Sequence, residues 1–267
     1  MACPRLTIIT PSYNQARYLE ETILSVLNQD YPNLEYIVMD GGSTDGSVEI
    51  VKKYASRLAY WESERDRGQS HALNKALDRA TGDYIGWLNS DDVYLPGSFR
   101  RVIAAFRRHP QAALVHGRRL LIDEDSRVFG WVPECRFDPN VAEYNIYSET
   151  AFWPRALADG QRFVEELRFA MDLSFFCSLH RRGPFINLPA YLGCFRCHGE
   201  SKSTLISEVA GREGKQEWER ILGRPGHQHV TETFARRFRR AVQPLLHPWL
   251  IGFPYLYRRF ILGQRGG

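Results

Sequence analysis

The first 95 residues alternate short apolar segments with segments of helical periodicity, and this alternation limits the possible folds more than any other feature. The predicted strands are 6–10, 34–39, 59–61 and 84–88, and the predicted helices between them are 18–29, 48–55 and 68–80. Helices of this length between strands indicate βαβ units. The sequence therefore predicts an α/β fold with a Rossmann-like, mainly parallel central sheet.

After Pro96 the pattern changes to a mixture of shorter segments. It predicts helices at 97–108 and 172–182, and strands at 113–116, 120–122, 128–131, 185–187 and 191–195. From about Ser203 the sequence has helical character. We expect one α/β domain over 1–202, composed of halves 1–95 and 96–202, and a helical extension over 203–267.

Polar residues gather where three of the predicted strands end: at 11–14, at 40–45 and at 89–92. The carboxyl ends of parallel strands meet at one edge of a sheet, where such folds bind ligands. Each loop alone is as well explained by plain turn formation. The three together favour a nucleotide pocket.

The segment Asn89-Ser90-Asp91-Asp92 closes the last of these strands. Carboxylate oxygens suit Mg²⁺ or Mn²⁺, and a divalent cation stabilises a departing diphosphate as a Lewis acid. The alternative is that an Asp caps the helix that begins near Pro96. Taken alone, the segment slightly favours the cap.

A family resemblance favours the metal site instead. The segments IITPSYN (8–14), SVLNQDYPNLEYIVMDGGSTDGS (25–47), GQSHALNKAL (68–77) and ATGDYIGWLNSDD (80–92) resemble the inverting glycosyltransferase family 2, which has the GT-A fold. The resemblance implies a metal-dependent enzyme that moves a sugar from a UDP-, dTDP- or GDP-sugar to an acceptor hydroxyl, with Mn²⁺ or Mg²⁺. Residues 1–95 would bind the nucleotide-sugar and residues 96–202 the acceptor.

The resemblance also implies roles for single residues of the donor pocket. Pro11 and Tyr13 would line the base pocket, and Asp40 would hydrogen-bond a pyrimidine ring. The rim of this pocket would be formed by Gly42, Ser43 and Asp45.

Further along the chain, Asn74 and Lys75 would lie near the diphosphate or in the helix beside it. Asp91 and Asp92 match the DxD-type motif that binds metal and ribose. Asn89 stands where the motif has its first acid, and its amide adds no charge to a metal site.

The general base is expected in FAMDLSFFCSLHRRG (169–183), where Asp172 begins a helix predicted to be amphipathic. An inverting transfer needs a carboxylate within reach of the acceptor hydroxyl, and a helix N-terminus favours the ionised form. The resemblance identifies Asp172 as this base. Without it, a plain first-turn acid is the preferred interpretation.

The segment Cys194-Phe195-Arg196-Cys197-His198 has the C-x-x-C-H form of haem attachment sites. No export signal precedes it and no further zinc ligands stand nearby, so we interpret it otherwise. It resembles the family's Arg-x-His segment, with His198 as a metal ligand and Arg196 as a structural or phosphate contact. The cysteines are expected to be buried, unpaired and reduced.

Two residues are candidates for acceptor binding. Trp153 has an aromatic face that suits the CH groups of a sugar, although a core position is the favoured alternative. Glu149, four residues earlier, offers a carboxylate to an acceptor hydroxyl.

The composition, with 43% hydrophobic and 25% charged residues, is that of a folded globular chain. No run of about 18 apolar residues is present, so a cytoplasmic protein is expected. The basic, aromatic segment 247–262 fits equally well a contact at the inner face of a membrane or a packed terminal helix. We expect a glycan or lipid-linked glycan as acceptor and no nucleic-acid partner.

Two other functions are alternatives to glycosyl transfer. A nucleotidyltransferase of similar fold needs a Gly-rich basic loop after the first strand, where this chain has PSYNQAR. A non-catalytic nucleotide- or sugar-binding module would have no need for Asp91, Asp92, Asp172 and His198 in this order.

Overall fold

The structure is a computed structural model that describes residues 3–132, 137–138, 143–199, 201 and 207–223. The helices are α1 (Ala16–Leu27), α2 (Ser47–Tyr54), α3 (Gln69–Arg79), α4 (Ser98–Arg108), α5 (Met171–His180) and α7 (Ser207–Leu222), with short 3₁₀ turns η1 (Ala55–Arg57), η3 (Ser148–Thr150) and η4 (Arg155–Leu157). The strands are β1 (Leu6–Ser12), β2 (Leu34–Asp40), β3 (Tyr60–Ser63), β4 (Tyr84–Trp87), β5 (Val93–Tyr94), β6 (Leu114–Ile122), β7 (Val128–Val132), β8 (Phe137–Asp138), β9 (Glu143–Tyr144), β10 (Phe152–Pro154) and β11 (Phe185–Arg196).

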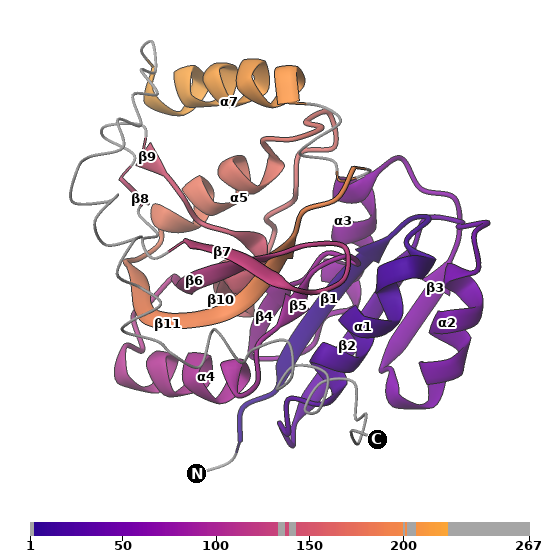
Figure 1. Ribbon diagram of the computed structural model, residues 1–267. Helices are drawn as coiled ribbons and strands as arrows, with labels where there is room; N and C mark the ends of the chain where they lie inside the picture. The colour runs from indigo at the N-terminus through magenta and orange to yellow at the C-terminus, as the bar shows by residue number, and fades with distance from the viewer. Residues whose placement is uncertain (1–2, 133–136, 139–142, 200, 202–206, 224–267) are drawn as a thin grey trace.

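One sheet runs through both halves of the described chain, in the order β3-β2-β1-β4-β10-β6-β11-β5, with β7 on β6 (Figure 1). The neighbours β3, β2, β1 and β4 are parallel, as are β6 and β11. Strand β10 is antiparallel to both β4 and β6, and it joins the two parallel groups. The α/β fold with a mainly parallel sheet is therefore confirmed.

Helices cover the two faces of this sheet. Side chains alternate along β2, where Ile37 and Met39 pack in the cluster with α3 and α5, while Tyr36 and Val38 pack in the cluster with α1, α2 and α4. Because both faces of the sheet are buried, the sequences of the strands are nearly continuous runs of apolar residues. The carboxyl ends of β1, β2 and β4 remain for the loops that form the site.

The second half differs from the sequence prediction in two ways. The segments 113–116 and 120–122 belong to the single strand β6, and 185–187 and 191–195 to β11, which is irregular between Asn187 and Gly193. Strand β10 was not predicted, since it is three residues long and contains Pro154. Gly117 and Pro189 interrupt the apolar periodicity without ending the strands.

Helix α7 lies beside α5 (Figure 1). Trp218 of α7 is fully buried and packs with Leu173 and Cys177 of α5. The Glu213 carboxylate accepts backbone N–H groups of residues 168, 169 and 170 at 3.1, 2.7 and 3.2 Å, directly before α5. Within the described part of the chain, no helix is long and apolar enough to cross a membrane. The basic and aromatic segment 247–262 lies outside that part.

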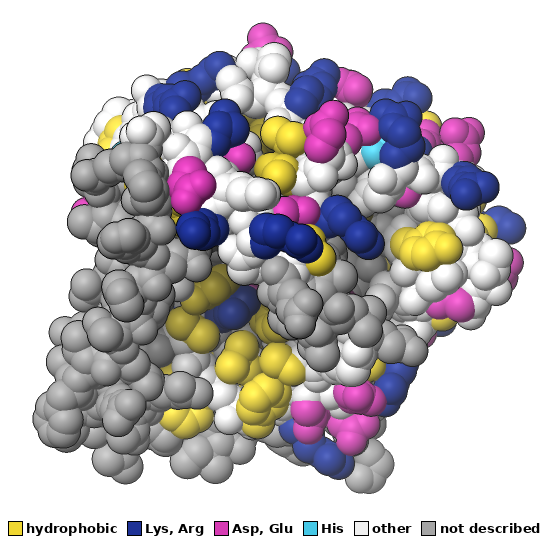
Figure 2. Space-filling view, turned by 90° about the horizontal axis from the view of Figure 1, so that it is seen from above, with side chains coloured by type: hydrophobic (Ala, Val, Ile, Leu, Met, Phe, Trp, Pro, Cys, Tyr) yellow, Lys and Arg dark blue, Asp and Glu magenta, His cyan; other side chains and the backbone are white. Residues whose placement is uncertain are grey.

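Figure 2 looks down on the molecule from above, on the side where Figure 1 draws α7. Lys and Arg side chains lie interspersed with Asp and Glu side chains over the described part of this face. Charges of both signs that alternate in this way give no strong field of one sign.

Candidate active site

The loops after β1 and β2 are joined at the carboxyl edge of the sheet. Ser12 and Asp40 end these strands in register. The Asn14 N–H donates to Ser43 Oγ at 2.8 Å, and Asn14 Oδ1 accepts the Thr44 N–H at 2.9 Å. Two of the three loops predicted to converge therefore meet.

Asp40 organises the loop that follows it. Its Oδ2 accepts the N–H groups of Gly42 and Ser43 at 3.1 and 2.9 Å and the Ser63 hydroxyl at 2.7 Å, while Oδ1 accepts the Ser43 hydroxyl. Gly42 has φ +82°, a conformation that favours glycine. Asp40 is thus buried in its own turn.

The other residues predicted for the base pocket differ in exposure. Pro11 is buried in β1, whereas the Tyr13 ring is 61% exposed, a high value for a large aromatic side chain. Asp45 accepts N–H groups from Ala16 and Ser47 at 2.8 and 3.0 Å, and it links the first turns of α1 and α2. Tyr13 is therefore the aromatic face that this loop region offers to a ligand.

Asn89 connects the loop after β4 with three neighbouring elements. Its Oδ1 accepts from Gln69 Nε2 at 2.7 Å and from Trp87 Nε1 at 2.9 Å. Its Nδ2 lies 3.3 Å from Asp92 Oδ2 and 3.5 Å from Ser148 Oγ. The amide donates from Nδ2, which a carboxylate in this position could not do, so Asn89 orients Asp92.

The helix-cap alternative for this loop is wrong. Helix α4 begins at Ser98 after Gly97, and no aspartate caps it, since the Ser98 N–H donates to Gln29 Oε1 at 3.1 Å. Asp91 instead faces His198, whose Nε2 lies 3.1 Å from Asp91 Oδ2. The Tyr18 ring covers the imidazole, with centroids 4.7 Å apart. A carboxylate oxygen and an imidazole nitrogen are thus brought together from β4 and β11.

Asp92 and Glu149 form the interior of this acid cluster. Both are buried, and Glu149 lies 3.4 Å from the Arg119 guanidinium. Burial, with the charges of Asp91 and Glu149, raises the pKa of Asp92 well above its usual range. Burial also raises the pKa of Glu149, against the opposing charge of Arg119. Burial thus favours the protonated form of these two carboxyl groups, and a bound cation would instead stabilise their charged form.

The backbone of β11 fits closely against Glu149. A Cβ on Gly193 would overlap the Glu149 carbonyl oxygen. Only glycine allows β11 and η3 to approach each other in this way. Glu149 therefore belongs to the buried cluster, and it is not exposed as an acceptor-binding residue would be.

Asp172 lies in the first turn of α5 and is half-buried. Its Oδ1 accepts the Leu173 N–H at 2.7 Å. The preceding Met171 accepts a contact from the Ser70 hydroxyl at 3.1 Å, in the turn of α3 whose Gln69 binds Asn89. This chain of contacts joins the start of α5 to the loop after β4. The helix is not amphipathic as predicted, because nearly all its residues are buried.

Asn74 and Lys75 are engaged in contacts that support the fold. Asn74 pairs with both backbone groups of Phe163 at 2.9 Å, and Lys75 Nζ bonds Glu62 Oε1 at 2.5 Å. Both residues lie in α3, one of the two places predicted for them. Their contacts fix α3 against the segment before α5 and against β3.

The acceptor role considered for Trp153 does not fit the structure. The ring is fully buried in β10 and packs edge-on against Phe175 and Phe176. A sugar has no access to such a ring, so the alternative of a core residue holds.

The C-x-x-C-H segment contributes its histidine to the cluster and its first cysteine to the core. Cys194 is buried and Cys197 half-buried, and both are free thiols, as are Cys3 and Cys177. Burial raises the pKa of the Cys194 thiol well above its usual range. The expectation of unpaired cysteines is confirmed for these four, and Cys135 lies outside the described residues.

The donor set of this cluster suits Mn²⁺ or Mg²⁺. Asp91 and His198 provide oxygen and nitrogen ligands, and the buried charge of Asp92 adds attraction. Among the described residues, no three His, Cys, Asp or Glu side chains are arranged to hold a metal by themselves. Mg²⁺ typically binds through one or two carboxylates plus substrate phosphates. The residues therefore fit an ion that arrives with a diphosphate.

Sequence reasoning missed three residues that support the cluster: Glu21, Gln69 and Arg119. Arg119 lies between the rings of Tyr147 and Phe195, 3.6 and 4.6 Å from their centroids. Glu21 bonds Arg196, and Gln69 bonds Asn89. A charged or amide residue in a helix or strand carries no local signal of such a contact.

Comparisons with known proteins identify the family of the chain. The sequence profile of the family described as "Glycosyl transferase family 2" matches residues 7–186. The chain is 30% identical over 223 residues to the "Putative teichuronic acid biosynthesis glycosyltransferase TuaG" of Bacillus subtilis (strain 168), covering 80% of this chain and 86% of that protein.

Two solved structures have similar folds. S. aureus TarS 1–349 in complex with UDP-GlcNAc has a TM-score of 0.65 and 20% identity, over 96% of this chain and 81% of that one. The mannosyltransferase PcManGT from Pyrobaculum calidifontis, in complex with GDP-Man and Mn²⁺, has a TM-score of 0.64 and 21% identity, over 100% and 77%. At this identity the likeness establishes a GT-A fold and nothing beyond the fold.

Proposed function

Because the chain belongs to glycosyl transferase family 2 and is a glycosyltransferase, we propose that it moves a hexosyl group from a UDP-, dTDP- or GDP-sugar to an acceptor hydroxyl, with inversion and with Mn²⁺ or Mg²⁺. One observation carries the proposal. Asp91, Asp92 and His198 meet at the carboxyl end of β4, with 3.1 Å between Asp91 Oδ2 and His198 Nε2. Such folds bind nucleotides at this edge.

Asp91 and His198 would hold the cation, and Asp92 would add charge to its site. A bound divalent ion supplies Lewis-acid stabilisation of the diphosphate as it leaves. Asn89 keeps the acids oriented through its contacts with Asp92 and Gln69. Asp91 would also contact the donor ribose.

Tyr13 and Pro11 would line the pocket for the nucleobase, and Asp40 and Gly42 would shape it. Tyr13 supports this assignment because its ring is 61% exposed beside the joined loops. Aromatic rings stack on nucleobases with little preference for which base is bound. Asn74 and Lys75 would support the pocket indirectly, because their contacts with Phe163 and Glu62 hold α3 in place.

Asp172 would act as the general base. Its place in the first turn of α5 favours the ionised form that accepts a proton from the acceptor hydroxyl. The hydroxyl oxygen would then attack the anomeric carbon on the side opposite the nucleoside diphosphate. Inversion follows because only one displacement takes place.

The acceptor would be a growing glycan or a lipid-linked glycan, in the synthesis of a cell-surface polysaccharide. The similarity to TuaG, whose name refers to teichuronic acid biosynthesis, supports this class. Residues 1–95 would form the donor side and 96–202 most of the acceptor side. The basic, aromatic segment 247–262 would contact a membrane surface or pack against the domain.

A direct experiment incubates the purified chain with UDP-, dTDP- and GDP-sugars and Mn²⁺ or Mg²⁺, and measures the nucleoside diphosphate released. We expect release with one nucleotide class and its loss with EDTA, with recovery when Mn²⁺ is restored. Release of pyrophosphate would instead indicate a nucleotidyltransferase. Binding without turnover, over a panel of glycan acceptors, would indicate a non-catalytic module.

A further inference from the structure

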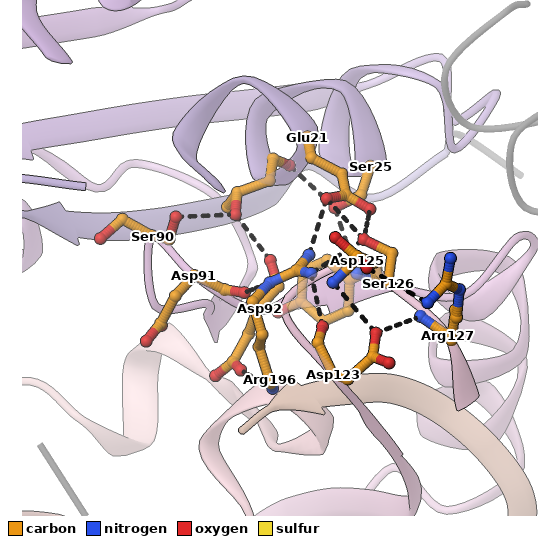
Figure 3. A network of polar contacts seen from close by, with 12 residues as sticks. Glu21, Ser25, Ser90, Asp91, Asp92, Asp123, Asp125, Ser126, Arg127 and Arg196 are labelled. Atoms are coloured by element: carbon orange, nitrogen blue, oxygen red, sulfur yellow. Dashed lines mark hydrogen bonds and ion pairs between the residues drawn. The ribbon is translucent and has the colours of Figure 1, made fainter. Parts of the chain in front are cut away.

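Arg196 is the last residue of β11 and its side chain is fully buried, which is rare for an arginine. Nε donates to the Asp91 carbonyl oxygen at 2.8 Å, and Nη2 donates to Glu21 Oε2 at 2.7 Å. Nη1 donates to the Asp123 carbonyl oxygen at 3.1 Å and to Ser126 Oγ at 2.8 Å. One guanidinium thus joins α1, the loop after β4 and the turn between β6 and β7 (Figure 3).

The main chain of Arg196 reaches the second aspartate. Its N–H donates to Asp92 Oδ1 at 2.9 Å. Two residues further on, His198 contacts the Asp91 carboxylate. Two residues of one segment, Arg196 and His198, therefore determine the carbonyl of Asp91, its carboxylate and the carboxylate of Asp92.

The surroundings of Arg196 are built to keep it in one place. Glu21 balances its charge, with the two side chains 15% and 0% exposed. The Arg196 Cζ lies 4.7 Å from the Tyr18 ring centroid. Ser126, which donates in turn to Glu21, has a left-handed φ of 64° that is unusual for serine. A lone buried guanidinium would be strongly unfavourable, so the Glu21 partner is required.

The sequence left open whether Arg196 contacts phosphate or supports the structure. All three guanidinium nitrogens donate to protein acceptors, and no part of the side chain is exposed. A planar fork with five donors can reach acceptors in these separate directions, and the single ammonium of lysine cannot. The geometry fits a support and leaves no face for a phosphate.

We propose that Arg196, balanced by Glu21, is a positioning residue that fixes the Asp91–Asp92 pair in the orientation that receives a divalent cation with its diphosphate. This inference rests on the proposed function, because it concerns the same site. It assigns to Arg196 no contact with the donor itself.

The test compares Arg196→Lys with the wild type in the full chain. Mn²⁺ binding is measured by the loss of the free-ion EPR signal, and nucleotide binding by calorimetry, with UDP and with GDP as probes. We expect Arg196→Lys to weaken Mn²⁺ binding in the presence of nucleotide by about 10–100-fold, as loss of a ligand-orienting contact does. Nucleotide affinity without metal should stay within about twofold.

The matched control is Arg127→Lys, because Arg127 lies in the same turn with its side chain 65% exposed and paired to Asp125. It should bind Mn²⁺ like the wild type. Should Arg196→Lys lose cooperative unfolding, Ser126→Gly replaces it as the test, since this change removes one acceptor of Nη1, suits the left-handed φ and keeps the ion pair with Glu21. We expect it to weaken Mn²⁺ binding by about 3–10-fold.

The outcomes separate the two proposals. A folded Arg196→Lys or Ser126→Gly chain that binds Mn²⁺ as tightly as the wild type overturns the positioning role and leaves the proposed function intact. A wild type that binds Mn²⁺ with neither nucleotide, and releases no diphosphate from any donor, overturns the proposed function and with it this inference.

Discussion

The two acidic regions of the site are held in opposite ways. Asp91 and Asp92 lie in a network that draws on α1, β11 and the β6–β7 turn, and Asp92 is 1% exposed. Asp172 lies half-buried at the start of a helix, where its carboxylate accepts an N–H of its own first turn. The acids proposed to bind a cation are therefore fixed by long-range contacts, whereas the proposed base is placed by a helix end.

The two regions also differ in the free-energy cost of their charges. The paired acids place like charges in the interior, which opposes folding until a cation or a proton neutralises them. Asp172 does not have this cost, because the amides of a helix N-terminus favour its charge. Substitutions should therefore separate catalysis, cation binding and stability from one another.

The largest effect is expected for Asp172→Asn. The amide keeps the shape of the side chain but cannot accept the proton of the acceptor hydroxyl, so turnover should fall by about 10²–10⁴-fold. Affinity for the nucleotide should be unchanged, because the donor site lies with the other acids. Rates of diphosphate release and calorimetry with UDP or GDP measure the two quantities.

The exposed residue Asp159 provides the matched control. Asp159→Asn should retain full turnover. If Asp172→Asn turned over at a rate near that of the wild type, Asp172 would not be the general base, and the two acidic regions would not differ in function as proposed.

Asp91→Asn should act on the cation instead. Loss of one charged ligand beside His198 is expected to weaken Mn²⁺ binding in the presence of nucleotide by about 100-fold, equivalent to about 3 kcal/mol. EPR titration of Mn²⁺ measures this. Unaltered Mn²⁺ affinity would mean that the ion, if bound, sits elsewhere.

Glu213→Ala should act on stability, because it removes the acceptor of three N–H groups before α5. Charge-assisted bonds and the unsatisfied donors left behind suggest a loss of about 2–3 kcal/mol in the free energy of unfolding. Urea denaturation measures this loss. Glu219→Ala, on the same helix with a side chain 40% exposed and a 4.0 Å contact to Lys215, should change it by less than about 0.5 kcal/mol. Equal effects of the two changes would show that α7 adds little to the placement of α5.

The fold of the first half was predictable because its signals are local. The strands and helices up to Trp87 begin and end within about two residues of their predicted positions, since apolar periodicity and turn residues act over short distances. The second half depends on long-range pairing. The three residues of β10 form a strand only because β4 and β6 lie on either side.

The candidate site divides in the same way. The roles of Asp91, Asp92 and His198 are predictions from the family resemblance, and the structure brings Asp91 and His198 into contact. Arg119 and Glu21 carry no comparable pattern, because only the folded chain places them beside Glu149 and Arg196. For Trp153 the sequence favours a core position over acceptor binding, and the structure shows the ring fully buried in β10.

The smallest effect is expected for Asp92→Asn without metal. This change tests directly how much the buried charge of Asp92 costs in stability. Because the pKa of Asp92 is raised in the folded state, the folded chain binds more protons than the unfolded chain between the unfolded and folded pKa values. Wild-type stability should therefore fall as pH rises through that interval. Asp92→Asn removes this contribution, and at neutral pH it should raise Tm by about 2–4 °C, the shift that about 1 kcal/mol produces in a domain of this size. With Mn²⁺ and nucleotide the order should reverse, since ligands stabilise only the chain that binds them. A metal-free Asp92→Asn chain that melts below the wild type at neutral pH would show that the buried carboxylate contributes more through its bonds than it costs in charge.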